Sequence, residues 1–102
     1  MQRGGTIWSC YPSDAPGPID FDSPAGKPVW VKRFVWRRAT DAPIPAGSVC
    51  HITDADENEV FYRIWPESVG DDVTEIELDV CSYFRGMKFE AFESGVLDLV
   101  MI

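Results

Sequence analysis

Apolar and polar residues alternate along most of the chain beyond residue 28, a period that is typical of β-strands with one buried face and one wet face. The clearest case is residues 74–80, where the apolar and the acidic side chains fall on opposite faces. The same period recurs at residues 87–91 and 97–101. No window of twelve or more residues shows the 3.6-residue period of an amphipathic helix, so we expect little or no helix.

Further strand signals occur at residues 29–38, which are rich in β-branched and aromatic side chains, and in the pair 49–53 and 60–65. The intervening residues 54–59, Asp-Ala-Asp-Glu-Asn-Glu, favour turns and predict a hairpin tip. A Glu-Ser-Gly turn at 93–95 precedes a final apolar strand. We expect that strand to lie in a sheet or against a partner, because an exposed apolar strand promotes aggregation.

Residues 1–28 do not follow this pattern. Five of the eight prolines fall within residues 12–28, and proline removes backbone donors and fixes φ. Only residues 6–11 are suited to a strand. The stretch still carries large apolar side chains, including Trp8, Tyr11 and Phe21, which are too many for a solvated linker. We interpret it as an irregular, Pro-rich N-terminal arm that lies across its own domain or across a neighbouring subunit.

Six or seven short strands with turn signals at regular intervals predict an all-β fold. We expect an antiparallel β-sandwich or a small jelly-roll-like barrel, with the arm at residues 1–28 and the β-sandwich domain at residues 29–102. The 102 residues are enough for one such core.

The composition excludes several classes of protein. Hydrophobic residues make up 45% of the chain and aromatic residues 13%, which excludes disorder. The apolar runs are too short to cross a bilayer, so we expect no membrane role. The formal net charge of −8 repels phosphate and argues against nucleic acid as a partner. The first residues lack the apolar segment of a signal peptide, so we expect synthesis in the cytoplasm.

The charge is unevenly distributed. Five of the nine basic residues lie within residues 27–38, and thirteen of the seventeen acidic residues lie from residue 54 onward. Such a basic strand either pairs with acidic neighbours in its own sheet or forms a basic face that docks on an acidic protein surface. Arg37 and Arg38 are the candidates for docking, because a guanidinium can bridge a carboxylate with two hydrogen bonds.

Metal and disulfide chemistry are not indicated. Cys10, Cys50 and Cys81 are odd in number, widely spaced and set in apolar surroundings, which predicts three buried, reduced thiols. Residues 54–58 match the opening of a calcium loop, but the glycine and the acidic ligand that the loop needs further on are missing. We therefore expect no metal and no cofactor.

The chain also lacks a catalytic signature. His51 is the only histidine and directly follows Cys50, and adjacent residues of a strand point to opposite faces, so the two cannot form a dyad. No serine lies in a Gly-x-Ser-x-Gly elbow, and no phosphate-binding glycine loop is present. We therefore expect that the protein is not an enzyme.

The aromatic residues either fill the core or line a face that binds sugar or peptide. Trp30 and Trp36 have the same parity along one strand, so we expect both to project from the same side, with Lys32 between them.

The segment Ala-Gly-Ser-Val-Cys-His-Ile-Thr-Asp-Ala-Asp-Glu-Asn-Glu-Val-Phe-Tyr-Arg-Ile-Trp at residues 46–65 resembles a pattern in small virion proteins of tailed bacteriophages. In these proteins a strand ends in a Thr-Asp-Ala-Asp-type hairpin and a valine-rich strand returns. The alternating strand, then Arg-Gly-Met-Lys-Phe-Glu-Ala-Phe at 85–92 and Ser-Gly-Val-Leu-Asp-Leu-Val at 94–100, continue the resemblance. It covers residues 46–102 and implies a structural virion component without catalytic residues.

The sequence thus predicts a capsid decoration (cement) protein that is made in the host cytoplasm and resides in the virion. Its expected partners are other virion proteins such as the major capsid protein, and further copies of itself as a homo-oligomer. The alternatives are a phage neck or tail accessory protein, or a small carbohydrate- or peptide-binding β-module. The predicted partner-binding residues are the arm aromatics, two strand tryptophans and two arginines, namely Trp8, Tyr11, Phe21, Trp30, Trp36, Arg37 and Arg38.

Overall fold

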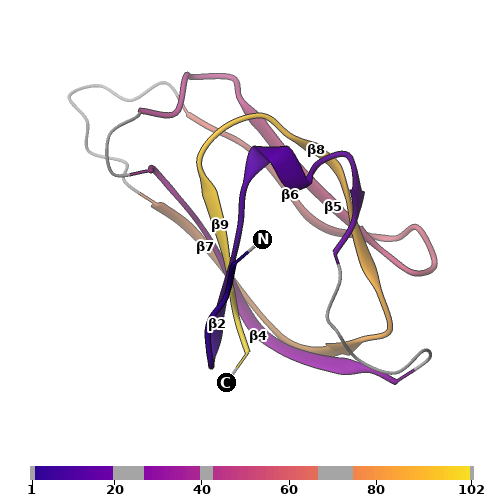
Figure 1. The fold of residues 1–102 in the computed structure, drawn as a ribbon. Helices are drawn as coiled ribbons and strands as arrows, with labels where there is room; N and C mark the ends of the chain where they lie inside the picture. Colours follow the sequence, from indigo (N-terminus) through magenta and orange to yellow (C-terminus); the bar gives the residue numbers. More distant parts are fainter. Residues whose placement is uncertain (1, 20–26, 40–42, 67–74, 102) are drawn as a thin grey trace.

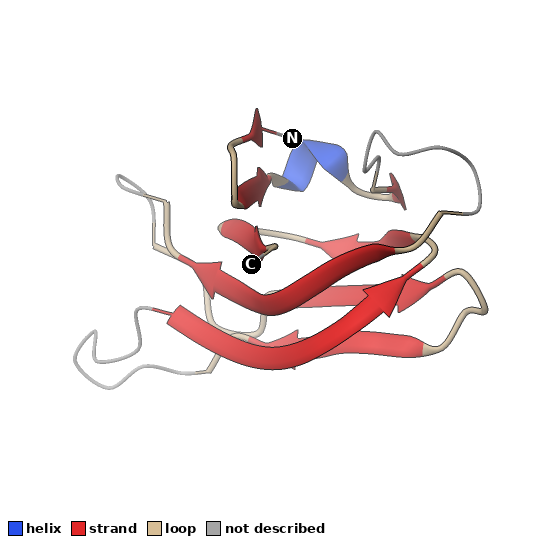
Figure 2. Cartoon of the chain, turned by 90° about the horizontal axis from the view of Figure 1, so that it is seen from below, coloured by secondary structure: helices blue, strands red, loops and turns tan. Residues whose placement is uncertain are grey.

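The structure, a computed structural model, describes residues 2–19, 27–39, 43–66 and 75–101. It confirms the all-β prediction, because the one helical segment among these residues is the single 3-10 turn η1, Pro12–Asp14 (Figure 2). The strands in chain order are β1 (Gln2–Arg3), β2 (Ile7–Cys10), β3 (Gly17–Pro18), β4 (Val29–Arg37), β5 (Val49–Asp54), β6 (Glu59–Ile64), β7 (Glu75–Phe84), β8 (Met87–Phe92) and β9 (Val96–Val100).

The strands form two antiparallel sheets (Figure 1). Sheet A has the order β1-β2-β9-β4-β7, and sheet B has the order β3-β8-β5-β6. The pairings are nested, with β5 on β6, β4 on β7, β3 on β8 and β2 on β9. This is the arrangement that results when one long hairpin, with β5 and β6 at its tip, is rolled into two layers. The order is that of a jelly roll, so the predicted jelly-roll-like sandwich is confirmed.

The described part of the N-terminal arm lies across its own domain. β2 pairs with β9 in sheet A, β3 pairs with β8 in sheet B, and η1 connects the two. The backbone N–H of Ile19 also donates to the carbonyl of Met87 at 2.8 Å. Cys10 and Ile19 are buried members of the core. The arm thus contributes β1 and β2 to sheet A and β3 to sheet B.

The core lies between the sheets and is largely aromatic. Phe34 of β4 contacts Phe61 of β6 across the sandwich, with ring centroids 5.5 Å apart. Trp36 packs edge-on against Trp65 at 5.1 Å, and its indole N–H donates to the Ser94 carbonyl at 2.9 Å. These side chains are the inward-facing half of the alternating pattern in the sequence.

One prediction about side-chain direction is wrong. Trp30 is 36% exposed, whereas Trp36 is completely buried, so the two do not share a face. The cause is a bulge, because the register with β7 shifts between Val31 and Arg33. Between the pairs at these two residues β4 advances by two residues and β7 by three, so the extra residue lies on β7. Across this irregularity Val31 and Phe34, three positions apart on β4, both face the core. Even-numbered residues of β4 therefore face outward at Trp30 and inward at Trp36.

Candidate functional site

The arm aromatics are engaged within the chain. Trp8 is half-buried and packs against the core, and Tyr11 is half-buried beside η1. The backbone N–H of Tyr11 donates to a carboxylate oxygen of Asp14 at 2.8 Å. Phe21 lies outside the described residues. Neither of the two described aromatics is an exposed anchor.

The basic strand pairs largely with acids of its own sheet. Arg37 Nε donates to Asp98 Oδ2 at 2.7 Å, and Ser9 Oγ donates to Asp98 Oδ1 at 2.6 Å. The hydrogen bond to Asp98 raises the pKa of Arg37 above its usual value. Arg33 forms an ion pair with Asp79 on β7. Of the two interpretations of the basic strand, internal pairing therefore describes both of these arginines, while Arg38 lies half-buried just beyond β4.

The cysteines are reduced, but only two are buried. Burial raises the pKa of Cys10 to about 12 and also raises the pKa of Cys50. Cys81 is exposed, which contradicts the prediction of three buried thiols. It has the same parity along β7 as the exposed residues Glu75, Glu77 and Asp79, so the alternation of the strand places it on the outer face.

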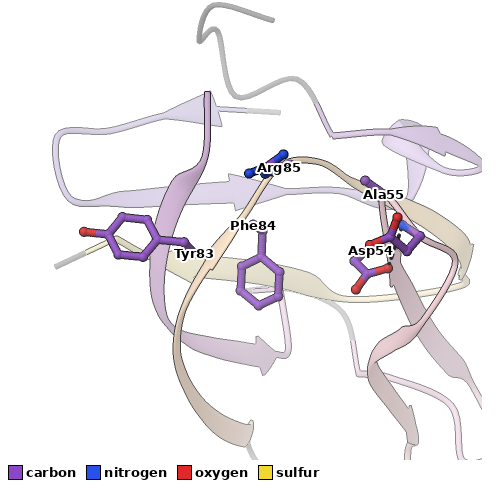
Figure 3. A pocket seen from close by; sticks show the side chains of 6 residues that line it. Asp54, Ala55, Tyr83, Phe84 and Arg85 are labelled. Carbon is purple, nitrogen blue, oxygen red and sulfur yellow. Dashed lines mark hydrogen bonds between the residues drawn. The ribbon is translucent and has the colours of Figure 1, made fainter. Parts of the chain in front are cut away.

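A pocket of about 320 Å³ opens between the β5–β6 hairpin tip and the β7–β8 turn. Its lining residues are Asp54, Ala55, Asp56, Tyr83, Phe84 and Arg85. In Figure 3, Phe84 and Arg85 lie between Tyr83 on one side and the hairpin tip on the other. Trp30 contacts Tyr83 edge-on, with ring centroids 5.1 Å apart, and both rings are exposed. The pocket and this aromatic pair can accept a polar ring or a short peptide.

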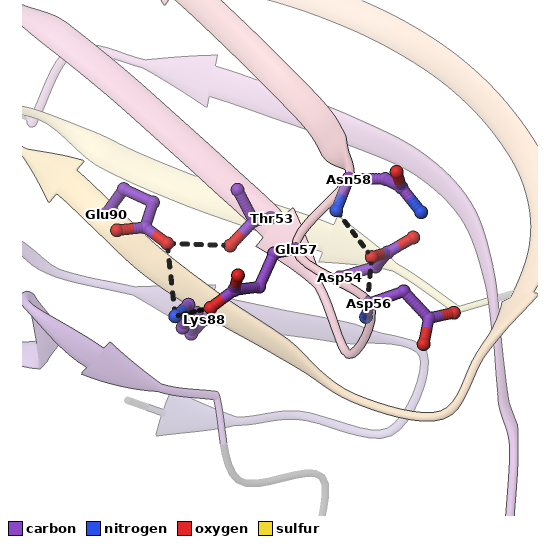
Figure 4. A network of polar contacts seen from close by, with 7 residues as sticks. All are labelled: Thr53, Asp54, Asp56, Glu57, Asn58, Lys88 and Glu90. Atoms are coloured by element: carbon purple, nitrogen blue, oxygen red, sulfur yellow. Dashed lines mark hydrogen bonds and ion pairs between the residues drawn. The ribbon is translucent and has the colours of Figure 1, made fainter.

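At the acidic β5–β6 hairpin tip, the Asp54 carboxylate hydrogen-bonds to the backbone of its own turn. Asp54 Oδ1 accepts hydrogen bonds from the backbone N–H groups of Asp56 and Asn58, each at 2.9 Å (Figure 4). Glu57 takes a left-handed conformation with φ at +64°. Across the described ranges, no group of three or more His, Cys, Asp or Glu side chains is arranged to hold a metal ion.

A polar network fastens this tip to β8 (Figure 4). Lys88 Nζ lies 3.5 Å from Glu57 Oε1 and 3.3 Å from Glu90 Oε1. The hydroxyl of Thr53 donates to Glu90 Oε1 at 2.9 Å. The hydrogen bond from Thr53 and then that from Lys88 lower the pKa of Glu90. Glu57 and Glu90 therefore help to hold the hairpin against β8.

An apolar patch lies on the outer face of sheet B. Tyr62 and Ile64 of β6 are 39% and 52% exposed. His51 packs edge-on against Tyr62 with ring centroids 4.9 Å apart, and Val49 pairs with Ile64. We call Val49, His51, Tyr62 and Ile64 the sheet B patch. His51 is thus on the outer face while Cys50 is in the core, as the alternation predicts.

The sequence analysis missed this patch, although a signal for it exists. The segment Val-Phe-Tyr-Arg-Ile-Trp at 60–65 is apolar at both parities. A strand in a two-layer sandwich can bury only one face, so the other face must present large apolar side chains to solvent or to a partner.

No protein-family model, characterised protein or solved structure matches this chain. Among the described residues, no helix is long and apolar enough to cross a membrane.

Proposed function

We propose that the protein is a structural component of a tailed-phage virion, a capsid decoration (cement) protein that binds the shell or neighbouring subunits. The observation that carries the proposal is the sheet B patch, since exposed apolar patches on small domains mark sites of protein association. It is the exposed half of the same hairpin that carries the resemblance to virion proteins.

Two further features support this role. Jelly rolls recur in viral capsid domains as well as in lectins, so the fold is compatible with this role. The net charge of −8 keeps many copies of a protein soluble at the high local concentration of a particle surface.

The experiment begins with the genome that encodes the chain, where capsid or portal genes are expected next to it. Particles of that genome are then purified by density gradient and searched for the protein by mass spectrometry. Particles stripped of the protein should rebind the purified chain saturably. Absence from purified particles, together with neighbouring genes of metabolism, would refute the proposal. Labelling in the electron microscope distinguishes a head position from the neck or tail position of the alternative accessory role.

A carbohydrate- or peptide-binding module is the second candidate, and the exposed Trp30–Tyr83 pair beside the 320 Å³ pocket favours it. Binding on a glycan array that is lost in Trp30→Ala and Tyr83→Ala would support this candidate. Trp36 cannot serve in such a test, because it is a core residue and its replacement perturbs the fold.

A further inference from the structure

The open edge of sheet B is partly covered by the side chain of Arg63. β6 is an outer strand, with β5 as its one neighbour among the described strands. The backbone N–H of Trp65 donates across to Ser48, so alternation directs the backbone groups of Tyr62 away from β5. Arg63 Nη1 donates to that outward carbonyl of Tyr62 at 2.8 Å. The guanidinium carbon also lies 5.5 Å from the ring centroid of Phe61. An added strand would have to displace this side chain.

The outer face next to this edge is open and has an acidic rim. Glu59 Oε1 lies 3.8 Å from His51 Nε2 at one end of the sheet B patch, and the Glu59 side chain is 63% exposed. Glu93 Oε1 accepts from the Val49 backbone at 2.7 Å at the other end, and Glu93 is exposed. The patch is thus an apolar surface between two carboxylates.

We propose that the sheet B patch docks, face-on, a protein partner that presents an apolar side chain between two basic residues. The partner's apolar group covers Tyr62 and Ile64, and its two cations meet Glu59 and Glu93. The inference deepens the proposed function and rests on it for the identity of the partner as another virion protein. The chemistry of the partner comes from the patch and its rim.

The two rim carboxylates favour a basic protein partner over a second copy of the chain, anionic lipid or nucleic acid. A second copy of the chain would bring its own Glu59 and Glu93 against the first pair, on a body of net charge −8. Anionic lipid and nucleic acid are repelled for the same reason. A strand added to β6 meets Arg63 at the Tyr62 carbonyl. A protein surface with an apolar centre and basic flanks can cover the apolar patch and pair with the two rim carboxylates.

The test is a titration of the full isotope-labelled chain, followed by NMR, with a short peptide that carries a leucine–tryptophan centre between two lysines. Chemical-shift changes should gather on β5 and β6 around the sheet B patch. Affinity should fall at least tenfold for the same peptide with glutamates in place of the lysines. It should fall similarly in Ile64→Ser and, as a second variant, in Tyr62→Ser. Ile7→Ser is the matched control, because Ile7 is 47% exposed on sheet A.

Several results would overturn the inference. These are shift changes elsewhere or none at millimolar peptide, equal binding of the glutamate peptide, or a tenfold gain in affinity in Arg63→Ala, which would indicate strand addition. A dimer in sedimentation equilibrium that becomes a monomer in Ile64→Ser would assign the patch to a second copy. If the peptide binds as expected but the protein is absent from purified particles, the docking surface stands and the virion proposal fails.

Discussion

The outer faces of the two sheets differ in how their side chains are used. On sheet A, Ser9, Arg37 and Asp98 form one hydrogen-bonded group that spans three adjacent strands. On sheet B, Tyr62 and Ile64 stand exposed beside carboxylates. The central strands of sheet A therefore pair their polar groups with one another, and the exposed rings of that sheet, Trp30 and Tyr83, lie beside the 320 Å³ pocket. The exposed apolar side chains of sheet B instead lie together on β6.

This difference shows that charge and binding capacity need not coincide in such a domain. The basic strand is the most prominent charge feature of the sequence, but its paired arginines join strands, and ion pairs at a surface contribute little to association. Association free energy comes mainly from large side chains that become buried on binding. The exposed residues of β6 meet that description, whereas the arm aromatics within the described ranges do not.

The largest loss of stability is expected for truncation of the buried tryptophan of β4. Trp36→Ala should lower the free energy of unfolding by about 3–5 kcal/mol, the usual cost of truncating a buried aromatic. The lost indole contacts Trp65 and hydrogen-bonds Ser94. Trp30→Ala on the same strand should cost about 1 kcal/mol or less. Urea denaturation followed by circular dichroism measures both, and similar losses would contradict the opposite burial of the two rings.

The next effect concerns the β8–β9 turn, where the chain crosses from sheet B to sheet A. Gly95 has φ at +91°, and a Cβ there would lie 2.8 Å from the Arg37 carbonyl and 2.5 Å from the Ile44 side chain. Gly95→Ala should cost about 2–4 kcal/mol from overpacking and backbone strain together. Gly47→Ala is the control with φ at +87° and open space, and should cost only about 1 kcal/mol. Equal costs in thermal unfolding would remove the steric explanation.

A smaller difference in stability is expected between a substitution on the outer face of sheet A and one on the outer face of sheet B. Arg37→Ala leaves Asp98, whose side chain is only 14% exposed, without its guanidinium, and should cost about 1–2 kcal/mol. Ile64→Ser on sheet B should change stability by no more than about 0.5 kcal/mol. Parallel denaturation curves of the two variants test this. Greater destabilisation by Ile64→Ser would mean that the sheet B patch supports the fold rather than a partner.

The smallest effect is on pH dependence. The Thr53 hydroxyl and then Lys88 lower the pKa of Glu90, so Glu90 stabilises the folded state at pH values above its unfolded pKa of about 4.3. That contribution is lost as the pH falls through the lowered folded pKa. Thr53→Val should therefore raise the Glu90 pKa toward its usual value and reduce the loss of stability in acid. Carboxyl carbon NMR titration gives the pKa, and an unchanged value would exclude the hydrogen bond as its cause.

The sequence predicted those parts of the molecule in which local alternation decides side-chain direction. β7 and the β5–β6 hairpin follow from the period of two and from the turn residues at 54–59. The opposite faces of Trp30 and Trp36 depend on the bulge where the register of β4 and β7 shifts, whereas the exposure of Cys81 follows from the alternation along β7. A bulge results from pairing between distant strands, so alternation along either strand alone does not reveal it. The sheet B patch does not follow from β6 alone, because this strand has large apolar side chains on both faces and only its pairing shows which face is buried.

The nested pairing also has a consequence for synthesis. Ser9 and Asp98 lie 89 positions apart and yet bond across β2 and β9, and β9 runs through the middle of sheet A. β9 leaves the ribosome after the other strands described here, so sheet A cannot close while the chain is still being made up to that point. A copy that terminates before Val96 lacks a central strand and exposes apolar faces to proteases. Truncated copies of this chain are therefore expected to be degraded rather than to accumulate beside the complete fold.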